Sequence, residues 1–165
     1  MYQPDQTDWK IIALLNEDGR MSSAEIARRL GDVSAPTVNN RIENLTKCGI
    51  INIRSIVNAN AIGYDVLADV FIQVEPGTIR DVAAALAEHP QISYLACSIG
   101  DADIIISIRA RSIQDLYIFV VDEIGKITQI RHTEIFPLTH NLKTNESWLP
   151  ADVLNADAGK SQGLG

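Results

Sequence analysis

Amide and guanidinium side chains recur along one side of the segment 35–47, APTVNNRIENLTK. The row consists of Thr37, Asn40, Arg41 and Asn44, which are spaced as neighbours on one helix face. Asn forms paired hydrogen bonds with adenine, Arg forms them with guanine, and Thr binds phosphate, so this chemistry suits a DNA major groove. A merely solvated face is the alternative, but solvated helices favour Glu and Lys, whereas Asn weakens a helix. The row therefore predicts a DNA-reading helix.

Cations and one further amide flank this row and are expected to support the contact with DNA. They are Arg20, Arg28, Arg29, Asn39, Lys47 and Arg54. Residues 20–54 hold six bases and three acids. Because this surplus is modest, one copy would bind phosphates weakly, and two or more copies are expected to act together.

Two short helices joined by a tight turn must position the row. Ser22 and Glu25 fit a capping box, in which the hydroxyl and the carboxylate bind free amides at a helix start. Gly31 is the expected end of that helix, and Ser34 is the expected N-cap of the next. The apolar face of the second helix is expected from Val38, Ile42 and Leu45. This pattern predicts a helix-turn-helix.

A first helix and a short extended segment complete the predicted N-terminal domain. Asp8, Ile11, Ile12 and Leu15 predict the first helix, which Asp18-Gly19-Arg20 should end. The β-branched residues after Gly49, IINIRSIV, predict a strand or wing. We expect this domain over residues 1–57 and a linker over residues 58–63, NANAIG.

From Tyr64 the hydrophobic period changes to two, with two helical stretches between strands. The predicted strands are Val66–Val74, Ile92–Ile99, Ile104–Ala110 and Ile130–Leu138. The predicted helices contain Ile79, Val82, Ala83 and Leu86, and then Ile113, Leu116, Tyr117, Val120, Val121 and Ile124. The order βαββαβ predicts an α+β, ferredoxin-like domain over residues 64–146. Residues 147–165 are expected to be a flexible tail in which Trp148 and Leu149 could dock.

The predicted strands are apolar on both faces, although the helices can cover only one. One example groups Ile92, Tyr94 and Ala96 on one face and Leu95, Cys97 and Ile99 on the other. An exposed apolar face of this size is unusual in a monomer. We therefore expect at least a homodimer, in which the open face packs on a second copy.

Composition narrows the class of protein further. The chain has 165 residues, 46% of them hydrophobic, and a net charge of −7. The excess acid lies after residue 60, because residues 1–60 hold seven acids and seven bases. The absence of a long apolar run and of a basic-then-apolar start predicts a cytoplasmic protein without a membrane span. Cys48 and Cys97 lack CxxC partners, so neither a zinc site, a disulfide framework nor a cofactor is expected.

With both halves in place, the chain resembles the Lrp/AsnC family of transcription regulators over residues 5–143. The motifs on which this resemblance rests are Asp8-x-x-Ile11-Ile12-x-x-Leu15, Asp18-Gly19-Arg20, Glu25-Ile26-Ala27, Thr37-Val38, Arg41-Ile42-x-x-Leu45, Gly49-Ile50-Ile51 and Gly100-Asp101-x-Asp103. The resemblance implies a winged helix-turn-helix that binds double-stranded DNA and a RAM-type effector-binding domain. It also implies dimers that associate further, often into octamers, and a small effector, commonly an amino acid, bound between subunits.

The resemblance places the effector at Gly100, Asp101 and Asp103, in the turn between the second and third strands. Gly lets the backbone approach a ligand closely, and a carboxylate can bind the ammonium of an amino acid. Taken alone, this motif is equally typical of a plain hairpin turn. The departures from the family pattern are an extra residue at Asp32, Ala102 in place of an aromatic residue, and Thr133-Glu134-Ile135 in place of Thr-x-Thr.

An enzyme is the main alternative, because decarboxylases of the siroheme and heme pathway resemble the same two-part architecture. Their chemistry would draw on Arg131, His132, His89 and His140. Scattered His without an acid–base partner at fixed spacing are more often packing or surface residues. A sensor without DNA contact is a further alternative, supported by the modest basic surplus. The intact polar row favours the regulator.

Overall fold

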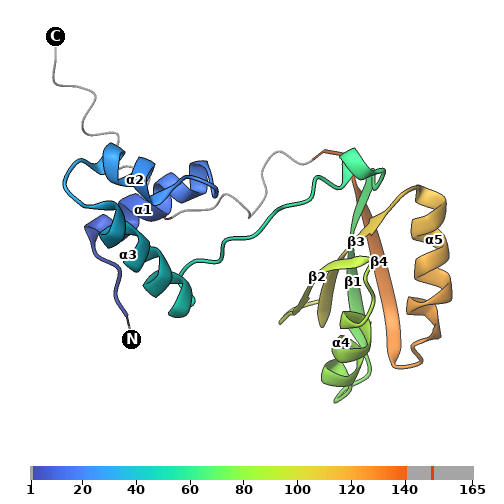
Figure 1. Cartoon of the computed structure of the whole chain (residues 1–165). Helices are drawn as coiled ribbons and strands as arrows, with labels where there is room; N and C mark the ends of the chain where they lie inside the picture. Colours follow the sequence, from blue (N-terminus) through green and yellow to red (C-terminus); the bar gives the residue numbers. More distant parts are fainter. Residues whose placement is uncertain (1, 141–149, 151–165) are drawn as a thin grey trace, which may run out of the picture. The chain divides into compact units, whose positions relative to one another are not determined.

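The computed structural model describes residues 2–140 and residue 150. Its described residues form two compact units, which divide between Ile56 and Val57 (Figure 1). Each unit has its own buried core. Apart from residue 150, the predicted tail at residues 147–165 lies outside the described residues.

The N-terminal unit is a three-helix arrangement. It contains α1 (Gln6–Glu17), α2 (Ser23–Leu30) and α3 (Ala35–Lys47). Three fully buried residues, Ile11, Ile26 and Val38, come one from each helix and pack together in a common core. Gly31 ends α2 with a φ of 79°, a conformation that glycine adopts without a Cβ clash. Ser34 caps α3 by accepting a hydrogen bond from the Thr37 N–H, as predicted.

The predicted capping box at Ser22 forms only in part. Ser22 Oγ accepts from the Glu25 N–H at 3.2 Å, but the Glu25 carboxylate binds Arg28 and Arg29. A guanidinium attracts a carboxylate more strongly than a neutral amide does, which explains the choice. A complete capping box occurs instead at the start of α1, between Asp5 and Asp8.

A strand or wing was predicted after Gly49, and of these two alternatives the strand does not form. Residues 51–58 contain no strand, and Ile53, Ile56 and Val57 are exposed. β-branched residues favour an extended backbone, but a strand also needs a partner with which to exchange hydrogen bonds. Within the predicted linker, the short 3-10 helix η1 (Asn60–Ile62) forms.

The C-terminal unit has the predicted βαββαβ order. Its elements are β1 (Val66–Val74), α4 (Ile79–Ala87), β2 (Ile92–Cys97), β3 (Ile104–Ala110), α5 (Ile113–Asp122), the 3-10 helix η2 (Ile124–Lys126) and β4 (Ile130–Leu138). The sheet order is β2-β3-β1-β4, and every pairing is antiparallel (Figure 1). The ferredoxin-like fold is therefore confirmed, with β2 ending at Cys97 and not at Ile99.

One face of the sheet packs against both helices. The strands contribute Ala68, Val70, Ile72, Val74, Ile104, Ile106, Ile108 and Ala110 to this core. The helical segments contribute Val82, Leu86, Leu116, Phe119 and Ile124. Alternate positions of β1 and β3 are buried, as expected of an antiparallel sheet whose helices lie on one side. No helix among the described residues packs on the opposite face, which we call the open face.

The prediction for the faces of β2 is wrong at its start. The register with β3 shifts between Ile92 and Tyr94. This irregularity brings Ile92 and Leu95 to the same core, whereas simple alternation would place them on opposite faces. Tyr94 is 53% exposed. A bulge of this kind has no reliable signature in the hydrophobic pattern.

Candidate functional site

The polar row of α3 lies opposite the buried face of that helix. Thr37, Asn40 and Asn44 are exposed, whereas Val38 and Leu45 are fully buried. In the described part of the chain, the Asn40 and Asn44 side chains have no hydrogen-bonding partner. Their amides are therefore free to pair with base edges, as the sequence suggested.

Arg41 departs from this row. Its Nη1 lies 2.8 Å from Asp5 Oδ2 and 2.8 Å from Asp8 Oδ1. The hydrogen bonds to Asp8 and Asp5 raise the pKa of Arg41 above its usual range. Arg41 was predicted to read a base, but here its guanidinium is engaged with α1. The geometry instead makes it a clamp between α1 and α3.

Asp8 is the buried end of this clamp. Its side chain is 1% exposed, and besides Arg41 it accepts hydrogen bonds from the Tyr2 hydroxyl at 2.7 Å and the Asp5 N–H at 3.0 Å. A buried carboxylate is costly unless it is paired and hydrogen-bonded, and Asp8 is both. The hydrogen bond to Asp8 also raises the pKa of Tyr2. The sequence pattern placed Asp8 in the first helix but gave no sign of this partner, which lies 33 residues away.

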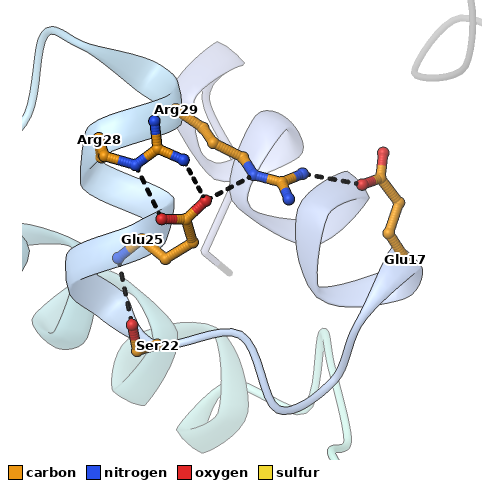
Figure 2. A network of polar contacts seen from close by, with 5 residues as sticks. All are labelled: Glu17, Ser22, Glu25, Arg28 and Arg29. Carbon is orange, nitrogen blue, oxygen red and sulfur yellow. Dashed lines mark hydrogen bonds and ion pairs between the residues drawn. The ribbon is translucent and has the colours of Figure 1, made fainter.

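A second carboxylate, Glu25, holds two of the predicted phosphate-binding arginines (Figure 2). Glu25 accepts from Arg28 Nε at 2.8 Å, from Arg28 Nη2 at 2.6 Å and from Arg29 Nε at 3.1 Å. Arg29 also reaches Glu17 of α1 at 3.2 Å. Hydrogen bonds from Arg28 and then Arg29 lower the pKa of Glu25 to about 2. Both arginines are therefore already neutralised within the chain.

Pairing extends along α3 to the other flanking residues. Glu43 accepts from Asn39 Nδ2 at 2.9 Å and lies 3.6 Å from Lys47 Nζ. Among the predicted phosphate-binding cations in the described residues, only the side chains of Arg20 and Arg54 lack a carboxylate partner. The free positive charge of the unit is thus smaller than its count of basic residues indicates.

A second candidate site is a hollow of about 650 Å³ on the open face of the sheet. Its lining comprises Asp69, Phe71 and Gln73 of β1, Ile105 of β3, His132, Glu134, Phe136 and Leu138 of β4, and residues 98–102. The apolar part of the lining includes Phe71 and Phe136, whose rings meet edge to face at 5.4 Å. The predicted effector turn thus borders a real depression of ligand size.

The turn is held to β1 by three hydrogen bonds. Asp103 Oδ2 accepts from the Val74 N–H at 2.8 Å, and the Asp103 N–H donates to the Ile72 carbonyl at 2.9 Å. Gln73 Nε2 donates to the Asp101 carbonyl at 2.7 Å. Gly100 and Asp101 line the hollow, but Asp103 does not. One carboxylate oxygen of Asp103 thus binds the backbone of β1, and its contact with an effector stays a prediction.

The lining of the hollow is acidic. Asp69, Asp101 and Glu134 contribute carboxylates, and among the described residues neither Lys nor Arg belongs to the lining. Glu134 Oε1 lies 3.5 Å from His132 Nε2, and Asp69 accepts a hydrogen bond from the Ser107 hydroxyl at 2.6 Å. Asp69 and Glu134 were not predicted as site residues, although both are acidic positions within predicted strands.

The residues that the enzyme alternative would use do not gather. Arg131 Nε donates to the Val74 carbonyl at 2.9 Å, and the His89 ring packs against Phe119 at 5.4 Å. Only His132 of this group lines the hollow. Over the described residues, no set of three or more His, Cys, Asp or Glu is placed to hold a metal ion. In the same part of the chain, no helix combines the length and apolarity that a bilayer crossing requires.

Comparison with known proteins matches both units of the chain. Residues 4–52 match the family described as winged helix-turn-helix DNA-binding, and residues 67–148 match the family described as Lrp/AsnC ligand binding domain. An uncharacterized HTH-type transcriptional regulator of Pyrococcus furiosus is 38% identical over 136 residues, which cover 82% of this chain and 91% of that protein. The leucine-responsive regulatory protein of Rhizobium meliloti is 30% identical over 124 residues, which cover 73% of this chain and 79% of that protein.

Solved structures share the arrangement of elements. Escherichia coli AsnC has a TM-score of 0.82 and 28% sequence identity, covering 87% of this chain and 97% of that one. A transcriptional regulator of Neisseria meningitidis, solved as a complex with L-Met, has a TM-score of 0.84. It covers 92% of this chain and 99% of that one, but at 20% identity it supports the fold alone.

Proposed function

The chain belongs to the Lrp/AsnC family of transcription regulators, and we propose that it acts as an oligomer that reads DNA through α3 and responds to an amino acid bound on the open sheet face. Its DNA-binding helix-turn-helix unit and its ligand-binding unit identify it as a DNA-binding regulator with a small-molecule domain. The proposal adds which residues read DNA, which effector binds and how copies of the chain assemble. It also places the action of the protein in the cytoplasm.

The observation that carries the DNA proposal is the free amide pair on α3. Asn40 and Asn44 lie one helical turn apart, are exposed and have no partner in the described chain. Thr37 lies on the same face, nearer the start of the helix, where recognition helices commonly contact bases. Arg20 and Arg54 supply phosphate contacts, while Arg41 fixes the position of α3 against α1. Base reading would thus rest on amides, and Arg41 would support it indirectly.

The open sheet face supports the assembly. Tyr94, Phe136 and Leu138 on this face are 53%, 48% and 39% exposed in the single chain. We propose that a second copy covers them, which would pair two recognition helices on successive major grooves of one site. The family resemblance extends this dimer to higher oligomers, commonly octamers. The hollow would then be enclosed at a subunit interface.

The first test is a mobility-shift titration with the DNA upstream of this protein's own gene, against random competitor DNA. We expect binding that exceeds the competitor and weakens with salt. Asn44→Ala should remove the preference for the specific site, whereas Gln114→Ala, which truncates an exposed amide of α5 in the other unit, is the matched control. Equal binding to specific and random DNA across a genomic fragment library would refute sequence-specific reading.

The assembly is tested separately by light scattering at micromolar concentration. We expect masses that are multiples of 18.1 kDa, with a dimer as the smallest species. Phe136→Asp should shift the distribution towards the monomer because it places a charge within the proposed interface. A monomer of the unaltered chain at this concentration would contradict the covered sheet face.

A further inference from the structure

We propose that the hollow selects an amino acid with a cationic side chain, such as lysine or arginine, over a neutral one. This inference rests on the proposed function, in which the hollow is the effector site. It adds the charge class of the ligand, which follows from the carboxylates that line the hollow.

The first argument is the charge balance of the lining. Asp69, Asp101 and Glu134 face a hollow to which residues 2–140 and 150 contribute no Lys or Arg, and His132 is already close to Glu134. Enclosing carboxylates without a cationic partner is costly. A ligand with a net positive charge removes this cost, whereas a neutral zwitterion brings an additional carboxylate that partly cancels its own ammonium. The balance therefore favours a ligand with two ammonium or guanidinium groups for each carboxylate.

The second argument is the spacing of the carboxylates. In the described chain they do not approach closely enough, with other ligands, to form a metal site. Asp69 pairs with Phe136, so Glu134 lies diagonally from Asp69 across the β1 and β4 strands. Diagonal neighbours in an antiparallel sheet lie about 7 to 8 Å apart. This separation suits an extended ligand with cationic groups at two points, and not a single ion.

The surface between the carboxylates suits an alkyl chain. Phe71 and Phe136 form an edge-to-face pair beside Asp69 and Glu134. The aliphatic stem of a lysine or arginine packs well on such rings while its charged end reaches a carboxylate. A cation near the ring faces gains further attraction from the aromatic quadrupole.

The turn offers donors for the ligand's own carboxylate. In the described chain, the N–H groups of Gly100 and Asp101 donate to no protein acceptor. Gly100 has a φ of 150°, and the space where a Cβ would stand is empty to at least 4 Å. Two free amides in a turn without a side chain at Gly100 can approach a carboxylate closely. The hollow thus has amide donors at the turn and carboxylates on the strands.

The test is isothermal titration calorimetry on the full chain at neutral pH with L-lysine, Nε-acetyl-L-lysine and L-leucine. Acetylation keeps the length of lysine and removes only its side-chain charge. We expect lysine to bind at least about tenfold more tightly than acetyl-lysine, which is the usual size of one charge-assisted contact. Glu134→Gln and Asp69→Asn should each weaken lysine binding by a similar factor. Asp122→Asn, an equal charge change at an exposed position of α5, should leave it unchanged.

The outcomes separate this inference from the proposed function. Binding of leucine with an affinity equal to or above that of lysine would overturn the charge selection and leave an amino-acid effector in place. No binding of lysine would overturn the charge selection, and a continued absence of binding when the other standard amino acids are titrated would overturn both. An equal loss of lysine binding in the Asp122→Asn variant would attribute the effect to overall charge and overturn the assignment to the hollow.

Discussion

Substituting Glu25 with Gln should strengthen binding to random DNA. In the native chain, Glu25 engages both Arg28 and Arg29, so neither guanidinium is free to contact phosphate (Figure 2). Gln keeps the shape of Glu but carries no charge, so it releases Arg28 and removes one of the two carboxylate partners of Arg29. Exposed ion pairs of this kind contribute little to folding, and the variant should therefore fold normally.

The magnitude follows from the number of arginines released. When the logarithm of the binding constant is plotted against the logarithm of the salt concentration, each phosphate contact makes the slope more negative by about 0.9. Two new contacts per copy would steepen this slope by about 1.8, so that a fourfold rise in salt weakens the variant about twelvefold more than the native protein. Release of Arg28 alone, with Arg29 retained by Glu17, would give about half of this change in slope.

Fluorescence anisotropy with a random duplex at several salt concentrations measures these slopes. Glu123→Gln is the matched control, because it releases Lys126 from a similar ion pair in the other unit and changes the net charge equally. Its slope should equal that of the native protein. Equal slopes for Glu25→Gln and Glu123→Gln would refute the reasoning. Either both slopes would follow the change in net charge, or neither substitution would release a phosphate contact.

Three further predictions concern the clamp, the reading row and pH. Asp8→Ala should lower the free energy of unfolding, measured in urea, by about 2 kcal/mol. This is less than the loss of a fully buried pair would cost, because Arg41 is 28% exposed. The control Asp32→Ala should have almost no effect, because Asp32 is exposed. Asn44→Ala should cost about 1 to 3 kcal/mol on a specific DNA site and nothing on random DNA, as competition titrations would show; equal losses on both would make Asn44 a phosphate contact. Because the pKa of Glu25 falls from 4.5 to about 2 on folding, its network stabilises the fold above pH 4.5 and loses this effect as the pH falls towards 2. Because the network is exposed and screened by solvent, the stability difference between native protein and Glu25→Gln should be small and should narrow over this range in urea titrations, and a difference that widens as the pH falls would contradict the network.

The elements of both units could be predicted because their signals are local. Gly31 ends α2, and Ser34 caps the start of α3 three residues later. The apolar spacing of α3 then indicates how far that helix extends. The strands β1, β3 and β4 were predicted to the residue because each is rich in β-branched and other apolar residues. The residues 50–57 look similar but lack a partner strand, which no local pattern reveals.

The chemistry of the candidate sites depends on long-range partners and was harder to predict. Arg41 looked like a base reader because its spacing matches the row, but its carboxylates come from the start of α1. Asp103 was predicted as a ligand contact because it lies in the turn, and one of its carboxylate oxygens is bonded to Val74 of another strand. In both cases the position along the element was right, while the direction of the side chain depended on tertiary contacts.

The paired cations explain why assembly and effector belong to one mechanism. A unit whose free cations are mainly Arg20 and Arg54 binds phosphates weakly, so useful affinity requires two recognition helices on one DNA molecule. The hollow lies on the sheet face that we assign to the contact between copies, so a bound ligand changes the free energy of that contact. Linkage then requires that specific DNA change the affinity for lysine by the same factor by which lysine changes the affinity for DNA. Calorimetric titration of the protein with lysine, in the presence and absence of the operator, measures how DNA changes the affinity for lysine. Mobility shifts with and without lysine measure how lysine changes the affinity for DNA. Unequal factors would mean that lysine acts at a site or in an assembly other than the one that binds DNA.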